Sequence, residues 1–292
     1  MGSIAVHARA SSRPPRPDSG RRRTHAAGHV TCGRVDFVWT AVYNGRDVTI
    51  LALDTSTHAG SVALRRAGTL LGEHAGSTDV PHARRLPGEI LDLLRQCRVP
   101  LADVSLYAVA SGPGAFTGLR IGIATIQGLA FAHGRPVVGI SALEAIAHAV
   151  RADAEAAGVQ LIAAWMDAAR GEVFTSLFEL GADGRPACLD PPSVDSPERT
   201  LARWSAIVSG RGVLCAGAGA VRYRAALAAA LGDRGLLVPH VPVLAGVIAE
   251  LADAATARGL AGPPHVLRPL YVRRPDAELA RDRARAASSP DL

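Results

Sequence analysis

The stretch that decides the fold is Ser111-Gly112-Pro113-Gly114-Ala115-Phe116-Thr117-Gly118-Leu119-Arg120-Ile121-Gly122. An apolar run at residues 104–110 precedes it, and an almost uncharged helical pattern covers residues 117–133. Together they predict a strand that passes through a Gly/Pro turn into a helix. Glycine lets the chain approach a ligand closely, and a helix N-terminus offers free N–H groups to an anion. Such a loop either cradles a phosphate or serves packing alone, and both interpretations stay open at this point.

The composition indicates one large or two modest domains. The chain has 292 residues, of which 48% are hydrophobic, enough for a substantial core. It contains no lysine, which excludes a Walker-A lysine, a Schiff-base lysine and a pyridoxal-phosphate anchor. No apolar run has the length of a membrane span, and the first residues lack the apolar region of a secretory signal. We therefore expect a cytoplasmic protein without membrane contact.

The two ends of the chain are expected to be tails. Residues 1–46 are rich in Arg, Pro and Ser and should be disordered. Residues 1–47 hold eight arginines and three aspartates, and so carry five of the six net positive charges. A nucleic-acid-binding arm, a transit peptide, and a solvated extension or a start codon placed too far upstream are the alternatives, and we favour the last. Residues 279–292 should fray.

The cysteines carry no metal or disulfide signature. Cys32, Cys97, Cys188 and Cys215 are widely spaced, and no Cys-x-x-Cys pair occurs. A disulfide framework or a zinc site is therefore disfavoured. We expect reduced thiols in the core of an intracellular protein.

Hydrophobic patterns predict two related lobes. Residues 48–157 follow the order β-β-β-α-β-α-β-α. This order matches the ribonuclease-H-like subdomain that occurs twice in the actin, sugar-kinase and Hsp70 superfamily. Residues 158–278 begin with two more strand patterns and include a helical pattern at 242–258, so we expect a shortened second lobe plus a C-terminal helix. Residues 181–199 are rich in Pro, Asp and Gly and are expected to be loop. The predicted fold class is α/β, an actin-like ATPase fold with two ribonuclease-H-like lobes.

Five motifs identify a family. They are Ile50-Leu51-Ala52-Leu53-Asp54-Thr55-Ser56-Thr57, the loop at 111–122, Val137-Val138-Gly139-Ile140-Ser141-Ala142-Leu143-Glu144-Ala145, Asp167-Ala168-Ala169-Arg170-Gly171-Glu172-Val173 and Pro269-Leu270-Tyr271-Val272-Arg273-Arg274-Pro275-Asp276-Ala277. In this order they resemble the TsaB (YeaZ) family over about residues 48–278.

The resemblance implies a non-catalytic scaffold. Members of this family serve the bacterial machinery that places threonylcarbamoyl on the adenosine next to the anticodon of ANN-decoding tRNAs. The implied partners are a TsaD-type catalytic paralogue and a TsaE-type ATPase, with tRNA contacted only through the complex. Whether a homodimer forms alone stays open. The alternative is a glycoprotease-like hydrolase, or an independent transferase or kinase of the same superfamily.

Two segments are candidates for a nucleotide site. In active members of the superfamily, the position of Asp54 helps to hold a metal–phosphate group, and the three hydroxyl residues after it could donate to a phosphate. Together with the glycines of the Gly/Pro turn, the candidate residues are Asp54, Thr55, Ser56, Thr57, Gly112 and Gly114. The alternative is that Asp54 caps its own turn. Gly217-Ala218-Gly219 is a weaker candidate for a second phosphate loop.

No catalytic or metal site is predicted. The catalytic paralogue binds its metal through two histidines four residues apart on a helix, and the matching positions here are Ala142 and Ile146. His133 and His148 lack a second ligand at the required spacing. We therefore expect no cofactor on the isolated chain, and ATP with a divalent metal only in the assembled complex.

The helix predicted at residues 117–133 is the candidate partner interface. Arg120 is its only charge, and a helix that is apolar all round must be covered all round. Gly118 and Gly122 would let another helix approach closely, while the alternative is a helix buried between the two lobes. The family resemblance implies that this helix and the helix at 82–97 form a dimer surface. The expected interface residues are His82, Leu86, Ile90, Leu94, Gly118, Arg120, Gly122 and Ile126.

Overall fold

The structure is a computed structural model that describes residues 48–273 and Arg281. The tail expected at 1–46 lies outside the described residues, as does the fraying end expected at 279–292 apart from Arg281. Across residues 48–273, no helix combines the length and the apolar character that a membrane crossing requires.

The first lobe is built on a five-stranded mixed sheet. Its strands are β1 (Thr49–Asp54), β2 (Ser61–Arg66), β3 (Thr69–Ala75), β4 (Leu106–Gly112) and β5 (Val137–Ser141), in the order β3-β2-β1-β4-β5. β1 pairs antiparallel with β2 and parallel with β4. β1 is buried at every residue, which is why it reads as a nearly continuous apolar run rather than an alternating one.

Two helices cover one face of this sheet. α1 (His82–Gln96) and α2 (Phe116–His133) pack on the core that includes Leu51, Leu53 and Val109. A short 3-10 helix, η2 (Leu101–Asp103), leads from α1 into β4. The last helix in the order expected for residues 48–157 is instead two helices, α3 (Ala142–Ala149) and α4 (Arg151–Ala156), because Val150 between them has non-helical angles (φ −108°, ψ 12°).

The second lobe repeats the same strand order. β6 (Leu161–Asp167), β7 (Val173–Leu180), β8 (Pro186–Asp195), β9 (Val213–Ala216) and β10 (Gly235–Leu237) form a sheet of order β10-β9-β6-β7-β8. Read by position within each lobe, both sheets run third, second, first, fourth, fifth. This repeat confirms the predicted fold class of two ribonuclease-H-like lobes. The outer face carries α5 (Pro197–Trp204), α6 (Ala218–Arg222), α7 (Arg224–Leu231) and η3 (Gly232–Arg234).

The loop expected at 181–199 is wrong. Residues 186–195 form β8, and α5 begins at Pro197 behind a Ser196 cap whose hydroxyl accepts a hydrogen bond from the Arg199 amide. The prolines that suggested a loop are tolerated because β8 is an edge strand of its sheet. The helical segment after β9 is likewise divided, into α6 and α7.

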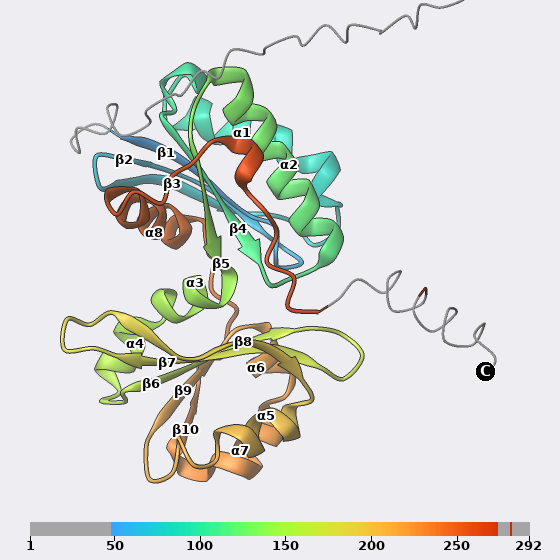
Figure 1. Cartoon of the computed structure of the whole chain (residues 1–292), viewed down its shortest axis with the longest axis vertical. Coiled ribbons are helices and arrows are strands. Elements are labelled where there is room, and N and C mark those ends of the chain that lie inside the picture. Colours follow the sequence, from blue (N-terminus) through green and yellow to red (C-terminus); the bar gives the residue numbers. More distant parts are fainter. Residues whose placement is uncertain (1–47, 274–280, 282–292) are drawn as a thin grey trace, which may run out of the picture. The chain divides into compact units, whose positions relative to one another are not determined.

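The chain returns to the first lobe after the second. α8 (Ala245–Ala257) packs on β1, β2, β4 and β5, and η4 (Pro264–Val266) packs beside α2. One apolar core contains residues of α3, α8 and both sheets, so these two helices lie between the sheets (Figure 1). The helix that the sequence groups with the second half therefore belongs to the core of the first sheet.

Candidate functional site

A cleft of about 910 Å³ lies where the ends of β1 and β6 face each other. Its walls are the turn after β1 (Ser56, Thr57, His58), the loop that leads into α2, the end of β6 and the turn after it, and the segment at residues 270–273. Ile146, Met166, Phe174 and Leu244 make its interior apolar. The volume and the apolar lining are typical of a small-molecule site.

The turn after β1 is locked by its own aspartate. Asp54 is 1% exposed, and its Oδ1 accepts hydrogen bonds from the Ser56 amide (2.8 Å) and hydroxyl (2.6 Å). Its Oδ2 accepts from the Thr57 hydroxyl (2.8 Å). Asp54 thus caps its own turn, as in the alternative left open by the sequence. Ser56 and Thr57 line the cleft, whereas Asp54 and Thr55 do not.

The glycines of the Gly/Pro turn have packing roles. A Cβ on Gly114 would lie 2.7 Å from the Ser56 carbonyl oxygen, and one on Gly112 would lie 2.6 Å from the Leu270 carbonyl oxygen. Gly112 also has φ +123°, which side-chain-bearing residues rarely adopt. Gly114 lines the cleft and Gly112 does not. Nucleotide binding by these residues stays a prediction, while their need for glycine is explained by close packing.

Residues 267–273, which we call the strap, cross from the first lobe to the second. The Leu270 amide donates to the Ser111 carbonyl (2.7 Å), and the Tyr271 ring stacks on Phe116 with centroids 5.2 Å apart. Arg120 lies over the Phe116 ring (3.9 Å) and its Nε donates to the Tyr271 hydroxyl (3.0 Å). The strap therefore joins the first turn of α2 to the cleft, a relation that its sequence motif alone did not predict.

The second lobe presents charged groups to the cleft. Arg273 of the strap pairs with Glu172 and donates to the Ala168 carbonyl (2.7 Å). Asp167 pairs with Arg222 (2.9 Å) and accepts a hydrogen bond from the Ala169 amide. Ala169 and Arg170 both have positive φ (57° and 54°), so this turn is held in a strained left-handed conformation. Ala218 of the weak second glycine loop also lines the cleft.

No group of three or more His, Cys, Asp or Glu side chains within residues 48–273 is arranged to hold a metal ion. Ala142 and Ile146 are buried in the core between the sheets. Burial lowers the pKa of His148, and neighbouring Arg151 lowers it further. His133 makes a hydrogen bond to the Leu129 carbonyl of its own helix (2.8 Å).

The cysteines differ in burial. Cys215 is buried, and burial raises the pKa of its thiol to about 12. Cys97 is half-buried and Cys188 is exposed on β8, so the expectation of core thiols holds for Cys215 and is wrong for Cys188. Cys32 lies outside the described residues.

Most of the expected interface residues lie inside their own lobe. Leu86, Ile90 and Leu94 of α1 are buried against the first sheet, as is Ile126 of α2. A Cβ on Gly118 would overlap the Thr55 carbonyl, and one on Gly122 would overlap the Thr55 hydroxyl. The two glycines therefore leave room for the turn after β1 rather than for a second molecule. These six residues were predicted to contact a partner directly, and the structure instead places them in the packing of their own lobe.

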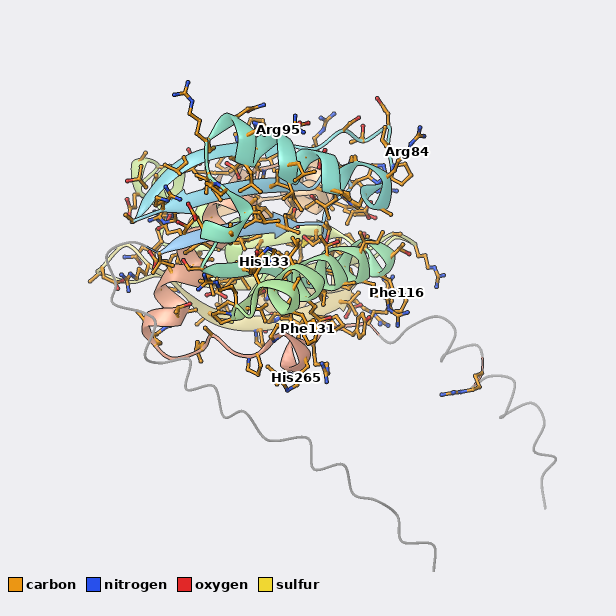
Figure 2. All side chains as sticks on the ribbon, turned by 90° about the horizontal axis from the view of Figure 1, so that it is seen from above. Arg84, Arg95, Phe116, Phe131, His133 and His265 are labelled. Atoms are coloured by element: carbon orange, nitrogen blue, oxygen red, sulfur yellow. The ribbon has the colours of Figure 1, made fainter. Side chains whose placement is uncertain are left out.

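The exposed sides of the same two helices remain available. We call them the α1–α2 face, with members Arg84, Leu91, Arg95, Phe116, Arg120, Ala124, Gly128 and Phe131. Phe131 is 83% exposed and Leu91 is 49% exposed. Figure 2 shows Phe116 and Phe131 near the two ends of α2, and Arg84 and Arg95 near the two ends of α1. Arg120 is the expected interface residue that this face retains.

His82 ties α1 to the turn after β1. Its Nε2 hydrogen-bonds the Thr57 carbonyl (3.1 Å), and its Nδ1 faces an Arg85 guanidinium nitrogen at 2.7 Å. Burial lowers the pKa of His82, and Arg85 lowers it further, while the Thr57 hydrogen bond, Asp54 and Glu89 act in the opposite direction. The sequence predicted His82 at the partner interface. In the structure it is half-buried and lies just behind the exposed side of α1.

The repeated sheets, the cleft between them and the helices α3 and α8 in the shared core define a two-lobed protein of the actin-like ATPase fold. A family model described as "TsaD: tRNA N6-adenosine threonylcarbamoyltransferase" matches residues 77–206. YeaZ from Pseudomonas aeruginosa is 34% identical, with a TM-score of 0.64, and the match covers 77% of this chain and 99% of that one. The chain belongs to the TsaB (YeaZ) family.

Curated relatives agree with this assignment. The tRNA threonylcarbamoyladenosine biosynthesis protein TsaB of Bacillus subtilis is 36% identical over 132 residues, which is 45% of this chain and 56% of that protein. TsaB of Escherichia coli is 37% identical over 136 residues, 46% of this chain and 57% of that protein. The chain thus spans little more than half the length of these TsaB proteins. An uncharacterised Mycobacterium tuberculosis protein is 32% identical over 236 residues, 79% of this chain and 94% of that one.

Proposed function

We propose that this protein is a non-catalytic docking subunit in tRNA threonylcarbamoyladenosine biosynthesis, and that it binds a TsaD-type transferase through the α1–α2 face. Its relatives in Bacillus subtilis and Escherichia coli carry that pathway in their names. The observation that carries the proposal is the outer side of α2. Phe131 is 83% exposed there, on a helix whose inner side is fixed in the core of the first lobe.

The shape of this face suits a partner helix. Ala124 and Gly128 are exposed in the middle of α2, between Phe116 and Phe131. Small residues flanked by large ones allow a second helix to approach closely while the large side chains pack at its sides. Burying a Phe side chain contributes about 1.5–3 kcal/mol. Phe131 is therefore the expected anchor of the interface.

The chemistry is assigned to the partner. In this proposal the chain itself holds no catalytic residue and no metal, and ATP with a divalent metal enters only in the assembled complex. A TsaE-type ATPase joins the pair, and tRNA is contacted through the complex. Such a protein works in the cytoplasm, where tRNA is modified. In the partner's absence, two copies could pair through the same face.

Co-purification with the TsaD-type subunit of the same organism tests the proposal. Ala124→Arg places a long cation at the centre of the α1–α2 face and is expected to abolish co-purification and formation of the modified nucleoside. Ala229→Arg, at an exposed position of α7 in the second lobe, is the matched control and is expected to behave as wild type. Circular dichroism checks that both variants fold. Equal partner binding by both variants would count against the α1–α2 face.

A further inference from the structure

Two backbone carbonyls of the turn after β1, those of Thr57 and Ala59, are bound by side chains of α1. His82 Nε2 hydrogen-bonds the Thr57 carbonyl (3.1 Å), and Arg85 donates to the Ala59 carbonyl. The opposite side of the same turn lines the cleft through Ser56, Thr57 and His58. One short segment thus lies between the cleft and a helix of the α1–α2 face.

Two glycines bring the turn within reach of these side chains. A Cβ on Gly60 would lie 2.7 Å from His82 Cε1, and one on Gly76 would overlap the Arg85 guanidinium. The Gly76 amide donates to the Gly60 carbonyl (3.0 Å), which joins the end of β3 to the turn. A side chain at either glycine would therefore displace His82 or Arg85.

Arg85 is fixed by several acceptors at once. One guanidinium nitrogen donates to both Glu89 carboxylate oxygens (2.6 and 2.7 Å), and Nε donates to the Val80 carbonyl (3.2 Å). The other terminal nitrogen reaches the Ala59 carbonyl and His82 Nδ1 (2.7 Å). The side chain is 8% exposed. Because every partner restrains it, Arg85 cannot turn away from His82 without losing hydrogen bonds.

This geometry allows only one protonation state of His82. A guanidinium has donors and no acceptor, so Nδ1 must be the unprotonated acceptor and Nε2 must carry the hydrogen that is donated to Thr57. A proton on Nδ1 would set two donors and two positive charges 2.7 Å apart. The other charged groups that act on His82 are Glu89 of α1 and Asp54 at the end of β1, and both favour the protonated form.

We propose that His82 and Arg85 form a proton-sensitive latch that holds residues 57–60 to α1 and so connects the α1–α2 face with the cleft. Neutral His82 keeps the latch closed. Protonation of Nδ1 breaks the hydrogen bond with Arg85, whereas Nε2 keeps its hydrogen and its donation to the Thr57 carbonyl, so the latch loses the bond that fixes His82 to Arg85. The connection to partner binding rests on the proposed function, whereas the latch itself does not.

Hydrogen exchange of the full chain between pH 8 and pH 5 tests the latch, with protection factors corrected for the intrinsic rate. The reporters are the amides of Gly60, which donates to the Thr57 hydroxyl, and Gly76. Their protection is expected to fall by about tenfold as His82 titrates, the equivalent of one hydrogen bond to a charged group. Unchanged protection while the His82 ring signals titrate would overturn the proposal.

Two variants sharpen the test. His82→Gln keeps a donor and an acceptor but does not titrate, so its protection factors should stay constant over this pH range. His240→Gln, at an exposed position of the second lobe, should retain the wild-type dependence. A fall that persists in His82→Gln would also overturn the latch. If that variant does not fold, the wild-type titration decides.

Adding the TsaD-type subunit separates the latch from the proposed function. Docking on α1 should raise the protection of Gly60 and Gly76 several-fold at pH 6. Binding without this rise would refute the connection between the α1–α2 face and the cleft and leave docking intact. Absence of binding at every pH would refute the proposed function, while hydrogen exchange of the chain alone would still test the latch.

Discussion

Gly122 packs directly against Thr55, so that a Cβ on Gly122 would overlap the Thr55 hydroxyl. Gly122→Ala should therefore overpack this contact and lower the free energy of unfolding by about 1–3 kcal/mol. Gly128→Ala is the matched control in the same helix, because a Cβ there meets no atom within 4 Å. It should raise the free energy of unfolding by about 0.4–1 kcal/mol. Urea denaturation measures both, and equal effects would contradict this account of Gly122.

The same contact shows what the sequence could and could not predict. The almost uncharged pattern of residues 117–133 predicted a helix correctly, and the apolar run at 104–110 predicted the strand before the Gly/Pro turn. The sequence could not tell which neighbour packs against the glycines. A turn of the same chain and a helix of a partner would both require a position without a side chain. Only the fold places Thr55 against Gly118 and Gly122.

Periodicity predicted the first lobe better than the second for a physical reason. β1, β4 and β6 are buried over most of their length and read as short apolar runs. β8 is an edge strand with three prolines and no residue fully buried, so its sequence resembles a loop. The cleft was only partly predictable, since the strap reaches it from more than 200 residues after β1.

The strap gives a second prediction. Tyr271→Ala removes the stacking on Phe116 and the hydroxyl that accepts from Arg120, whereas Tyr271→Phe removes only the hydroxyl. An aromatic pair contributes about 0.5–1.5 kcal/mol. Hydrogen-exchange protection of the Leu270 amide, bonded to Ser111, should therefore fall by about 2- to 10-fold in the Ala variant and less in the Phe variant. An equal loss in the two variants would show that the hydroxyl, rather than the ring, holds the strap.

Two histidines predict how stability depends on pH. The pKa values of His82 and His148 are lowered from 6.5, chiefly by burial. The unfolded chain therefore takes up these protons at a higher pH than the folded chain does. The contribution of both groups is fully present above pH 6.5 and is lost as the pH falls toward the folded pKa values. Urea denaturation at steps from pH 8 to pH 5 should show this fall, and the double variant His82→Gln/His148→Gln should flatten it.

Glu144 predicts the opposite sign. Burial raises its pKa from 4.5, although Arg258 acts to lower it. The folded chain therefore keeps this proton to a higher pH than the unfolded chain, and the stability that it contributes below pH 4.5 is lost as the pH rises through the folded pKa. Glu144→Gln should raise the free energy of unfolding at pH 7, with the gain disappearing near pH 4. Glu198→Gln, exposed in the first turn of α5, should give no such gain.

The thiols should react in the order of their exposure. The thiolate is the reactive form, so a buried thiol of high pKa is protected twice, by its protonation and by its surroundings. Cys188 is exposed, Cys97 is half-buried with a raised pKa, and Cys215 is buried with a pKa of about 12. Iodoacetamide at pH 8 should label Cys188 first, Cys97 more slowly, and Cys215 only in urea. Peptide mass spectrometry measures the three rates, and labelling of Cys215 in the native protein at the rate of Cys188 would mean that β9 opens readily at the centre of the second lobe.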